Sequence, residues 1–291
     1  MRVSAIIPCL DAEEYIGVAI RSLLNQTCPP DEIIVADNGS TDASRAIARS
    51  FGGSVRLIDV AERGASRARL AGAAKAEGEA LLFCDADDLL APETLAALTQ
   101  ALERGEGDIA CAPWYRFERG AGGAWHWAPP SCAPRYAGQD DLSAWLGGWY
   151  HPPCSVLWSR AAYDRSGGWD PAIGVNDDGD VMMRGLARGN VLARTGVGAG
   201  FYRRLPEGGS LSAAGRTPTG LASRLAVLGK VMDALDESGR IPAYRNALGA
   251  ALAQIGADIP VGSADLHATC AALILRLGGD PRPLTGRAAP P

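Results

Sequence analysis

The chain has 291 residues, of which 47% are hydrophobic and 21% charged, a balance typical of a globular protein with a substantial core. Its formal net charge of −5 argues against a general nucleic-acid binder, because such proteins depend on clustered lysine and arginine. The length allows one large domain, or one domain with a smaller appendage.

The seven cysteines are scattered along the chain and include no C-x-x-C pair, which argues against a zinc ribbon and a disulfide framework. We expect free, mostly buried thiols in a reducing cytosol. The first apolar run, Val3 to Pro8, is too short for a signal peptide. No window approaches the roughly 20 apolar residues that span a bilayer, so we expect a cytoplasmic protein, with peripheral membrane contact left open.

The first hundred residues alternate between short apolar runs and segments of helical period. The apolar runs predict strands over 3–8, 32–36, 55–60 and 80–84, and the intervening segments predict helices over about 12–25, 42–51 and 65–76. Strands separated by helices of this length predict a parallel sheet in a doubly wound α/β arrangement. In such sheets a ligand binds beyond the carboxyl ends of the strands.

The second half of the chain is less regular. Residues 114–158 are rich in Trp, Pro and Gly, and we expect them to shape the substrate site. Residues 217–277 have a helical pattern with breaks near Pro242 and at 259–262. We therefore expect a main domain over residues 1–215 and a helical C-terminal extension over 216–291. The extension could support the substrate site, form a homodimer contact or contact a membrane surface.

Three aspartates, Asp85, Asp87 and Asp88, follow the fourth predicted strand directly. Carboxylates this close together repel one another unless a cation or a basic group neutralises them. Hard oxygen ligands suit Mg²⁺ or Mn²⁺, which keep open positions for the phosphates of a substrate. The alternative is a solvated turn that caps the next helix, but the end of a buried strand favours a metal and diphosphate site.

Further charged positions are candidates for the same site. Asp37 follows the second strand, where its carboxylate can accept a hydrogen bond from a base or a ribose, or can instead form an Asx turn. Arg69, in the third helix, either offsets donor phosphates or lies on a solvated face. A second acidic cluster, residues 176–180, could supply a general base. A second metal site and a plain acidic loop compete with that interpretation.

Aromatic residues and histidines are concentrated between residues 125 and 151. Because aromatic rings pack well against the C–H faces of sugars, they could form a platform for a sugar ring, or they could fill the core beneath the loop. The residues concerned are Trp125, His126, Trp127, Trp145, Trp149, Tyr150 and His151.

In order and spacing, a series of motifs resembles the family 2 glycosyltransferases, which have the GT-A fold, a Rossmann-like sandwich. The motifs are Ser4–Pro8, Tyr15-Ile16, Ser22–Thr27, Glu32–Asp42, Ala68-Arg69, Gly78-Glu79, Phe83–Asp88, Gly167–Asp170 and Asp177–Asp180. The match covers roughly residues 3–212. The resemblance implies an inverting transfer from a nucleotide-sugar donor, expected to be UDP-linked, to a glycan, a lipid or a small molecule.

The resemblance also implies roles for individual positions. Pro8, Asp11 and Asp37 would line the nucleoside site, Asp85 and Asp88 would contact the donor, and Asp87 would bind Mn²⁺ or Mg²⁺ directly. Asp178 matches the general base of the family, Arg69 matches a donor contact, and Arg203 or Arg204 could hold the diphosphate. The chain departs from the family at Leu70, where Asn is usual, and near Leu205, where His is frequent.

Two other functions remain open from the sequence. A sugar nucleotidyltransferase of related shape would need a glycine-rich, basic loop after the first strand, and Pro8-Cys9-Leu10-Asp11 does not provide one. A non-catalytic nucleotide-sugar binder is consistent with Leu70 and Leu205, whereas the retained aspartates favour an enzyme.

Overall fold

The structure is a computed structural model that describes residues 1–120, 123–204 and 211–281. The chain divides into two compact units. The first contains residues 1–131, 151–171 and 189–206, and the second contains residues 132–150, 172–188 and 207–291. The helices of the expected C-terminal extension therefore belong to the second unit, which also takes in two earlier segments that no feature of the sequence marks.

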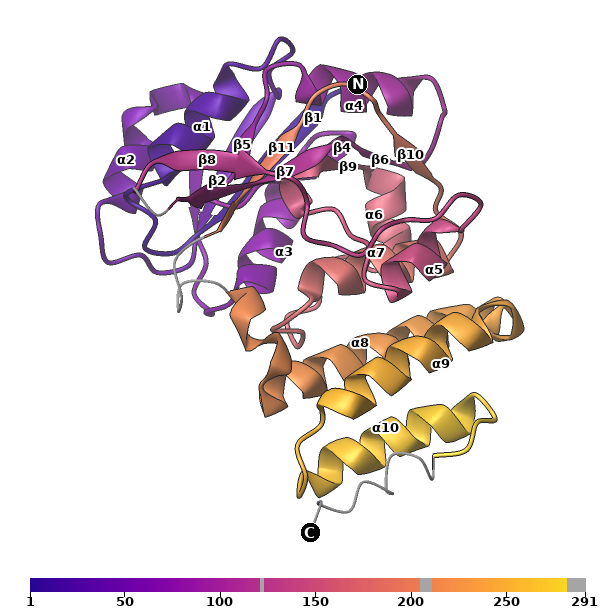
Figure 1. Ribbon diagram of the computed structural model, residues 1–291. Coiled ribbons are helices and arrows are strands. Elements are labelled where there is room, and N and C mark those ends of the chain that lie inside the picture. Colours follow the sequence, from indigo (N-terminus) through magenta and orange to yellow (C-terminus); the bar gives the residue numbers. More distant parts are fainter. Residues whose placement is uncertain (121–122, 205–210, 282–291) are drawn as a thin grey trace. The chain divides into compact units, whose positions relative to one another are not determined.

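Within the described residues, the first unit is built on a main sheet of seven strands (Figure 1). In spatial order the strands are β10 (Leu192–Arg194), β6 (Ile109–Cys111), β9 (Val156–Ser159), β4 (Ala80–Phe83), β1 (Val3–Cys9), β2 (Glu32–Asp37) and β3 (Arg56–Asp59). The first four strands of the chain pair in parallel, as the sequence predicts, with Ile6 opposite both Ile34 and Phe83.

One strand corrects the expectation of a parallel sheet. β9 runs antiparallel to both of its neighbours, β4 and β6. After β6 the chain leaves the sheet and returns at the same edge, where the N–H of Ala112 donates to the carbonyl of Ser155 at 2.9 Å. A strand that enters at the edge where its neighbour ended must run in the opposite direction, so this connection makes the sheet mixed.

Helices cover both faces of the main sheet (Figure 1), because alternate residues of a strand point to opposite faces. On one face, Ala5 and Ile7 belong to a core cluster with Ile20 of α1 and Leu98 of α4. On the other, Ile6 lies against Gly72 of α3, where a Cβ atom would be only 2.4 Å from Ile6 Cγ2. The helices of this unit are α1 (Ile16–Leu24), α2 (Ser44–Ser50), α3 (Ala65–Lys75), α4 (Thr94–Glu103) and α6 (Arg160–Ser166).

A second, small sheet was not predicted from the sequence. In the described part of the chain it has four strands, in the order β5 (Leu89–Leu90), β11 (Gly200–Arg204), β7 (Trp114–Arg119) and β8 (Trp125–Ala128). Because β5 follows Asp88 directly, this sheet begins where the acidic cluster ends. The small sheet thus adds side chains from three distant segments to the carboxyl edge of the main sheet.

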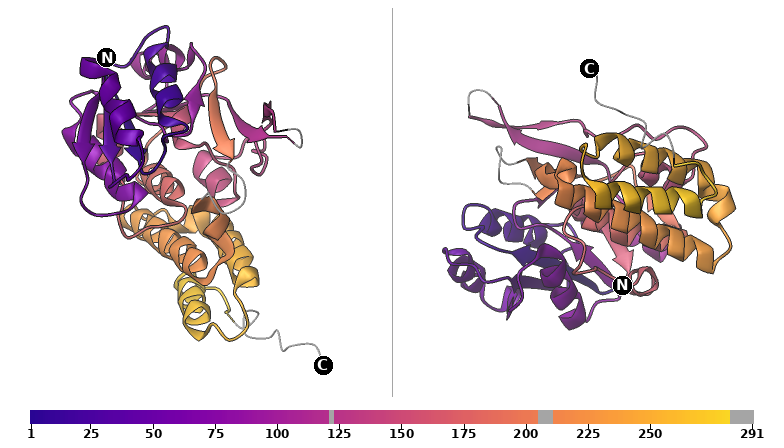
Figure 2. Two further views of the ribbon diagram at one scale, coloured as in Figure 1. Left: turned by 90° about the vertical axis from the view of Figure 1, so that its left-hand side faces the viewer. Right: turned by 90° about the horizontal axis from the view of Figure 1, so that it is seen from below.

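The second unit is helical. It contains α5 (Asp141–Leu146), α7 (Asp177–Ala187), α8 (Pro218–Glu237), α9 (Ile241–Asp258) and α10 (Ala264–Arg276). α8 packs against α7, and α8, α9 and α10 pack on one another (Figure 2). The expected breaks near Pro242 and at 259–262 coincide with the ends of these helices. Short 3-10 turns lie at Gly52–Ser54 and Pro153–Ser155 in the first unit and at Leu211–Arg216 in the second.

No helix in the described residues is both long enough and apolar enough to cross a membrane.

Candidate active site

The candidate site lies at the carboxyl ends of β1, β2 and β4. Asp37 is the last residue of β2 and pairs with Cys9 of β1, while Asp85 comes two residues after the end of β4. Because these strands are parallel neighbours, their ends meet at one edge of the main sheet. The fold thereby brings Pro8, Asp37 and the Asp85–Asp88 cluster to the same edge, as the sequence predicts.

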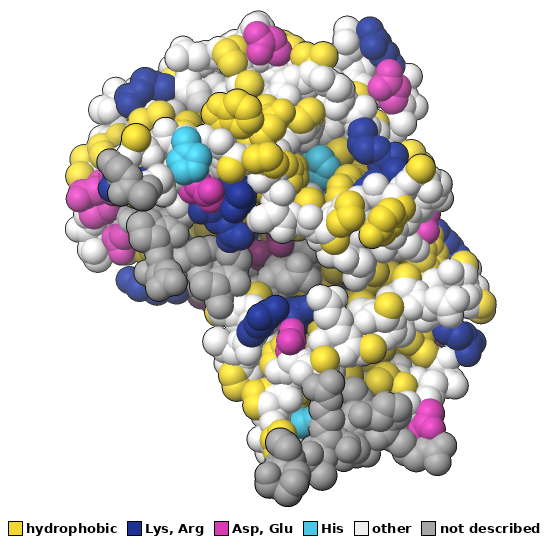
Figure 3. Space-filling model, in the orientation of Figure 1, with side chains coloured by type: hydrophobic (Ala, Val, Ile, Leu, Met, Phe, Trp, Pro, Cys, Tyr) yellow, Lys and Arg dark blue, Asp and Glu magenta, His cyan; other side chains and the backbone are white. Residues whose placement is uncertain are grey.

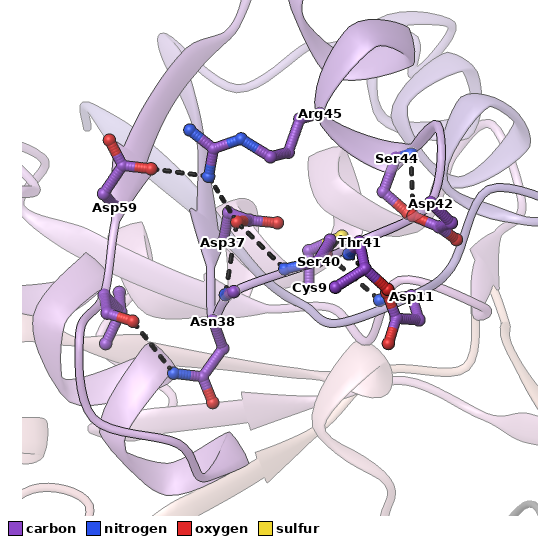
Figure 4. Close-up of polar contacts among 12 residues, drawn as sticks. Cys9, Asp11, Asp37, Asn38, Ser40, Thr41, Asp42, Ser44, Arg45 and Asp59 are labelled. Carbon is purple, nitrogen blue, oxygen red and sulfur yellow. Dashed lines mark hydrogen bonds and ion pairs between the residues drawn. The ribbon is translucent and has the colours of Figure 1, made fainter.

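The carboxylate of Asp37 is fully buried and is held by donors from the following loop and helix (Figure 4). Its Oδ2 atom accepts from the N–H groups of Gly39 and Ser40 at 3.2 and 3.3 Å, and from Arg45 Nη1 at 2.5 Å. Its Oδ1 atom is buried and has no hydrogen-bond partner in the described chain. A buried acceptor without a donor costs free energy, so this atom is suited to a donor from a ligand.

Arg45 links Asp37 to a third strand, since its Nη1 atom also lies 2.5 Å from Asp59 Oδ1 at the end of β3 (Figure 4). The ion pair with Arg45 lowers the pKa of Asp59. Neither residue was singled out from the sequence. Arg45 is in the second helix and Asp59 is at the end of the third strand, and no local sequence pattern indicates that two such residues form an ion pair.

Asp11 and Asn38 tie together the loops around this site. Asp11 adopts a left-handed conformation (φ 45°), and its Oδ1 atom accepts from the N–H of Thr41 at 2.7 Å. Asn38 donates to the carbonyl of Glu62 at 2.6 Å and accepts from the N–H of Gly64 at 2.5 Å. The structure thus places Asp11 beside the expected nucleoside site, with one carboxylate oxygen engaged by its neighbouring loop.

Arg69 and Asp85 form a partly buried ion pair. Arg69 Nη2 donates to Asp85 Oδ1 at 2.5 Å, and the side chain of Arg69 is only 6% exposed. The guanidinium carbon lies 4.6 Å from the centre of the Trp169 ring, and that ring contacts Phe83 edge-to-face at 5.1 Å. Arg69 is therefore directed into the site rather than lying on a solvated helix face, and Trp169 is a support that the sequence did not reveal.

Asp87 and Asp88 carry charge that is poorly compensated. Burial and the neighbouring charge of Asp85 raise the pKa of Asp87 to about 6, and Asp87 forms no ion pair with a described residue. Asp88 is fully buried, its Oδ1 atom accepts from the N–H of Arg203 at 2.8 Å, and its Oδ2 atom has no partner within the described residues. Burial and the charges of Asp87 and Asp85 raise the pKa of Asp88 as well.

Arg203 of β11 joins the small sheet to this cluster. Its Nε atom donates to the backbone carbonyl of Asp87 at 2.6 Å. Its guanidinium carbon lies 4.7, 4.8 and 4.3 Å from the ring centres of Tyr15, Phe117 and Trp125, within the range of cation–π attraction. The aromatic rings hold the charge beside Asp87, and burial lowers the pKa of Arg203.

The acidic cluster suits a divalent cation in part. Among the described residues, no group of three or more His, Cys, Asp and Glu side chains is arranged to hold a metal by itself. Mg²⁺, however, is commonly bound by one or two carboxylates together with the phosphates of a substrate. The carboxylate of Asp87, which forms no ion pair with a described residue, fits that smaller role, because a cation there would offset the repulsion from Asp85.

The second acidic motif lies in the second unit, at the start of α7. Asp178 is half-buried in the first turn, and its Oδ1 atom accepts from the N–H of Gly179 at 2.8 Å. Asp180 is fully buried and is paired with Arg184 at 2.5 Å and Lys230 at 3.1 Å. The motif therefore combines an accessible carboxylate in the first turn of a helix with a carboxylate that fixes the helix to α8.

The aromatic residues between 125 and 151 have different environments, so neither of the two open interpretations applies to all of them. Trp145 is 6% exposed and belongs to the core of the second unit, whereas Trp127 is 63% exposed on the edge strand β8. His151 is buried, and burial lowers its pKa to about 4. Leu70 is 38% exposed, and Leu205 lies outside the described residues.

Solved structures share this architecture. Staphylococcus aureus TarS 1–349 in complex with UDP-GlcNAc aligns with a TM-score of 0.65 at 18% identity, over 94% of this chain and 85% of that one. The mannosyltransferase PcManGT of Pyrobaculum calidifontis, in complex with GDP-Man and Mn²⁺, aligns with a TM-score of 0.58 at 22% identity, over 94% and 80% of the two chains. These likenesses establish the fold, which is that of the GT-A class.

The chain belongs to the glycosyl transferase family 2, whose model matches residues 4–164. The glycosyltransferase YibD of Escherichia coli is 39% identical over 126 residues, which are 41% of this chain and 36% of that protein. GlyG of Streptococcus pneumoniae is 26% identical over 153 residues, which are 50% and 51% of the two chains. The chain spans about half the length of GlyG and about a third of YibD, and the resemblance stated from the motifs is confirmed.

Proposed function

We propose that this glycosyltransferase moves a sugar, with inversion, from a UDP-linked donor to an acceptor hydroxyl. The observation that carries the proposal is the state of Asp87, which is half-buried beside Asp85 with a pKa raised to about 6 and without an ion pair in the described chain. A site with surplus negative charge at the end of a sheet needs a cation, and a cation there would in turn attract a diphosphate.

Asp87 would hold Mn²⁺ or Mg²⁺, and the ion, when bound, would offset the charge of the departing diphosphate. Arg203 stabilises the ionised form of Asp87, because its charge lowers the pKa of that carboxyl. Arg69 holds Asp85 in place through the 2.5 Å ion pair. Asp88 anchors β11 and thereby keeps Arg203 beside the cluster.

Asp37 supports the assignment of the nucleotide. Its Oδ2 atom already accepts from Gly39, Ser40 and Arg45, so only Oδ1 is left for a base. Uracil offers a single imide N–H between two carbonyl groups, which suits one acceptor atom. Guanine presents two adjacent donors and would be better served by a carboxylate with both oxygens available.

Asp178 is proposed as the general base. Its half-buried carboxylate lies in the first turn of α7, near the positive end of the helix dipole. As the acceptor oxygen attacks the anomeric carbon from the side opposite the diphosphate, Asp178 takes the proton of the hydroxyl. The bond between the anomeric carbon and the diphosphate oxygen breaks, and its electron pair leaves with the diphosphate. Because the attack comes from the opposite side, the configuration at the anomeric carbon is inverted.

Calorimetry tests the donor half of the proposal. UDP should bind in the presence of Mn²⁺ more tightly than GDP, and Asp87→Asn should abolish the effect of Mn²⁺. Asp37→Asn should weaken UDP binding. Asp59→Asn, which removes the exposed partner of Arg45, should retain most of the affinity for UDP. Equal binding of UDP and GDP by the wild type would overturn the assignment of the nucleotide.

The base is tested separately. Asp178→Asn should bind UDP and Mn²⁺ as the wild type does and should lose transfer, with Asp177→Asn as the neighbouring control. Full turnover by Asp178→Asn would remove that residue from the mechanism. A cytoplasmic location, a peripheral membrane contact, a homodimer and a domain boundary at residue 215 stay predictions.

A further inference from the structure

One face of the small sheet carries a continuous set of aromatic side chains. Residues that alternate along a strand share a face, and residues opposite one another on neighbouring strands are in contact. By the observed register, the aromatic residues on this face are Phe201 of β11, Tyr115 and Phe117 of β7, and Trp125 and Trp127 of β8. Below, these five residues are called the aromatic face.

Ring contacts join the aromatic face into two groups, which are neighbours because Phe117 lies opposite Trp127. Tyr115 stacks on Phe201 with ring centres 6.1 Å apart, and it meets Trp127 edge-to-face at 5.1 Å. Phe117 stacks on Trp125 at 4.9 Å. The opposite face of the sheet is different, since Trp114 there is only 3% exposed and packs against Tyr202. The aromatic face is thus not the side of the sheet on which Trp114 is buried.

The aromatic face begins at the reaction site of the proposed transfer. Phe117 and Trp125 enclose the guanidinium of Arg203, which donates to Asp87. Arg203, Phe117 and Trp127 are opposite one another on three successive strands. With neighbouring strands about 4.8 Å apart, the backbone of Trp127 lies roughly 10 Å from that of Arg203. A short oligosaccharide spans such a distance.

The far end of the aromatic face is open. Trp127 is 63% exposed on β8, the edge strand of the small sheet in the described chain, while Tyr115, which contacts it, and Phe201 are half-buried. Indole is a large apolar surface that proteins usually bury, so its exposure next to a binding site favours a ligand that covers it. The outward edge of β8 also presents backbone groups to which hydroxyl groups can hydrogen-bond.

The chemistry around the aromatic face favours a sugar over a lipid. Arg119 lies over the Trp125 ring at 5.1 Å and pairs with Glu14 at 3.1 Å. Over β7 and β8, Figure 3 shows a histidine and acidic and basic side chains beside apolar ones. A pyranose ring has one apolar C–H face and a rim of hydroxyl groups, which matches aromatic rings bordered by charges.

We propose that the aromatic face is an acceptor subsite that stacks a pyranose ring of a glycan, with Trp127 as its outermost contact. The subsite deepens the proposed transfer and rests on it, because it names the acceptor as a carbohydrate chain rather than a lipid or a lone small molecule. The ring stacked on Trp127 is a sugar of the acceptor other than the one that receives the donor sugar.

The test is binding of defined oligosaccharides, namely cellotetraose, maltotetraose and N,N′,N″-triacetylchitotriose, measured by saturation-transfer NMR and titration in the presence of UDP and Mn²⁺. At least one of them should bind the wild type. Trp127→Ala should weaken that binding about tenfold, and Trp127→Tyr should restore most of it, because a stacked ring is preserved. Tyr136→Ala, which removes an equally exposed aromatic residue (66%) of the second unit, is the matched control.

Several results would overturn the subsite. The first is that the wild type binds none of the three oligosaccharides. The second is that Trp127→Ala binds them as well as the wild type does. The third is that the protein binds phosphatidylglycerol vesicles in a Trp127-dependent way but binds no oligosaccharide. Binding of UDP with Mn²⁺ should be the same in all these variants. Failure of the wild type to bind UDP and Mn²⁺ would instead count against the proposed function, so the two failures are distinguishable.

Discussion

The side chain of Arg203 donates to the backbone carbonyl of Asp87 at 2.6 Å, and its backbone N–H donates to Asp88 at 2.8 Å. One residue of β11 thus fixes two consecutive residues of the acidic cluster although 115 positions separate it from Asp88. The aromatic rings around it prevent the guanidinium from turning to solvent. Arg203 is therefore part of the geometry of the acidic cluster as well as a source of positive charge.

Arg203→Met should reduce the affinity for UDP and Mn²⁺ by about tenfold or more, since the loss of the positive charge raises the pKa of Asp87 further and removes a charged contact. Arg204→Met is the matched control, because Arg204 points to the other face of β11 and lies over Tyr202 at 5.6 Å. Calorimetry of both variants measures the difference. Similar losses in the two variants would argue against a specific role for Arg203.

Binding of Mn²⁺ with UDP should weaken as the pH falls through about 6. A metal ligand must be deprotonated, and Asp87 takes up a proton near that pH because it is half-buried beside Asp85. Below pH 6 the affinity should fall about tenfold per pH unit. Titrations between pH 5 and 8 check the prediction, and in Arg203→Met the same curve should shift to higher pH.

We expect Asp180 to be needed for stability and Asp178 to be needed for transfer. Asp180→Asn should lower the free energy of unfolding by about 3 kcal/mol, because Arg184 and Lys230 then lose a buried partner. Asp178→Asn should change it by less than about 1 kcal/mol, the size of a helix-dipole interaction near a surface. Urea unfolding of the two variants distinguishes them, and equal destabilisation would contradict the distinction.

His151 should make the protein less stable in acid. Burial lowers its pKa in the folded chain to about 4, whereas in the unfolded chain it binds a proton near 6.5. Between these values the unfolded state binds more protons, so stability falls as the pH drops from 6.5 to 4, by up to about 3 kcal/mol. His151→Asn should have a flatter profile in this window, while the exposed His126→Gln should follow the wild type.

Two glycine-to-alanine changes in helices should have opposite signs. Gly72→Ala should destabilise the first unit by about 1–3 kcal/mol, since the new Cβ atom would lie 2.4 Å from Ile6 Cγ2. Gly249→Ala in α9 should stabilise the second unit by about 0.5–1 kcal/mol, because no atom lies within 4 Å of its Cβ position. Thermal unfolding measures both. A neutral Gly72→Ala would mean that α3 can move away from β1.

Much of the site could be predicted from the sequence because its carboxylates follow strands that a hydrophobic pattern identifies. Asp37 and Asp85 mark strand ends, and parallel strands bring such ends together. Their partners could not be predicted in the same way. Arg45, Trp169 and the rings of Phe117 and Trp125 reach the site from separate elements, and a contact between distant segments leaves no period in the sequence.

By itself the sequence determined the first four strands and the helices between them, the helical C-terminal region with its two breaks and the acidic edge of the main sheet. These features follow from local preferences, namely the period of apolar residues and the positions of proline and glycine. Only the tertiary structure decided the reversed direction of β9, the small sheet and the position of Arg203 over Asp87. Each of these features depends on where the chain returns after a long connection. The place of return is set by the need to bury the main sheet and to give the polar groups at its edge hydrogen-bond partners.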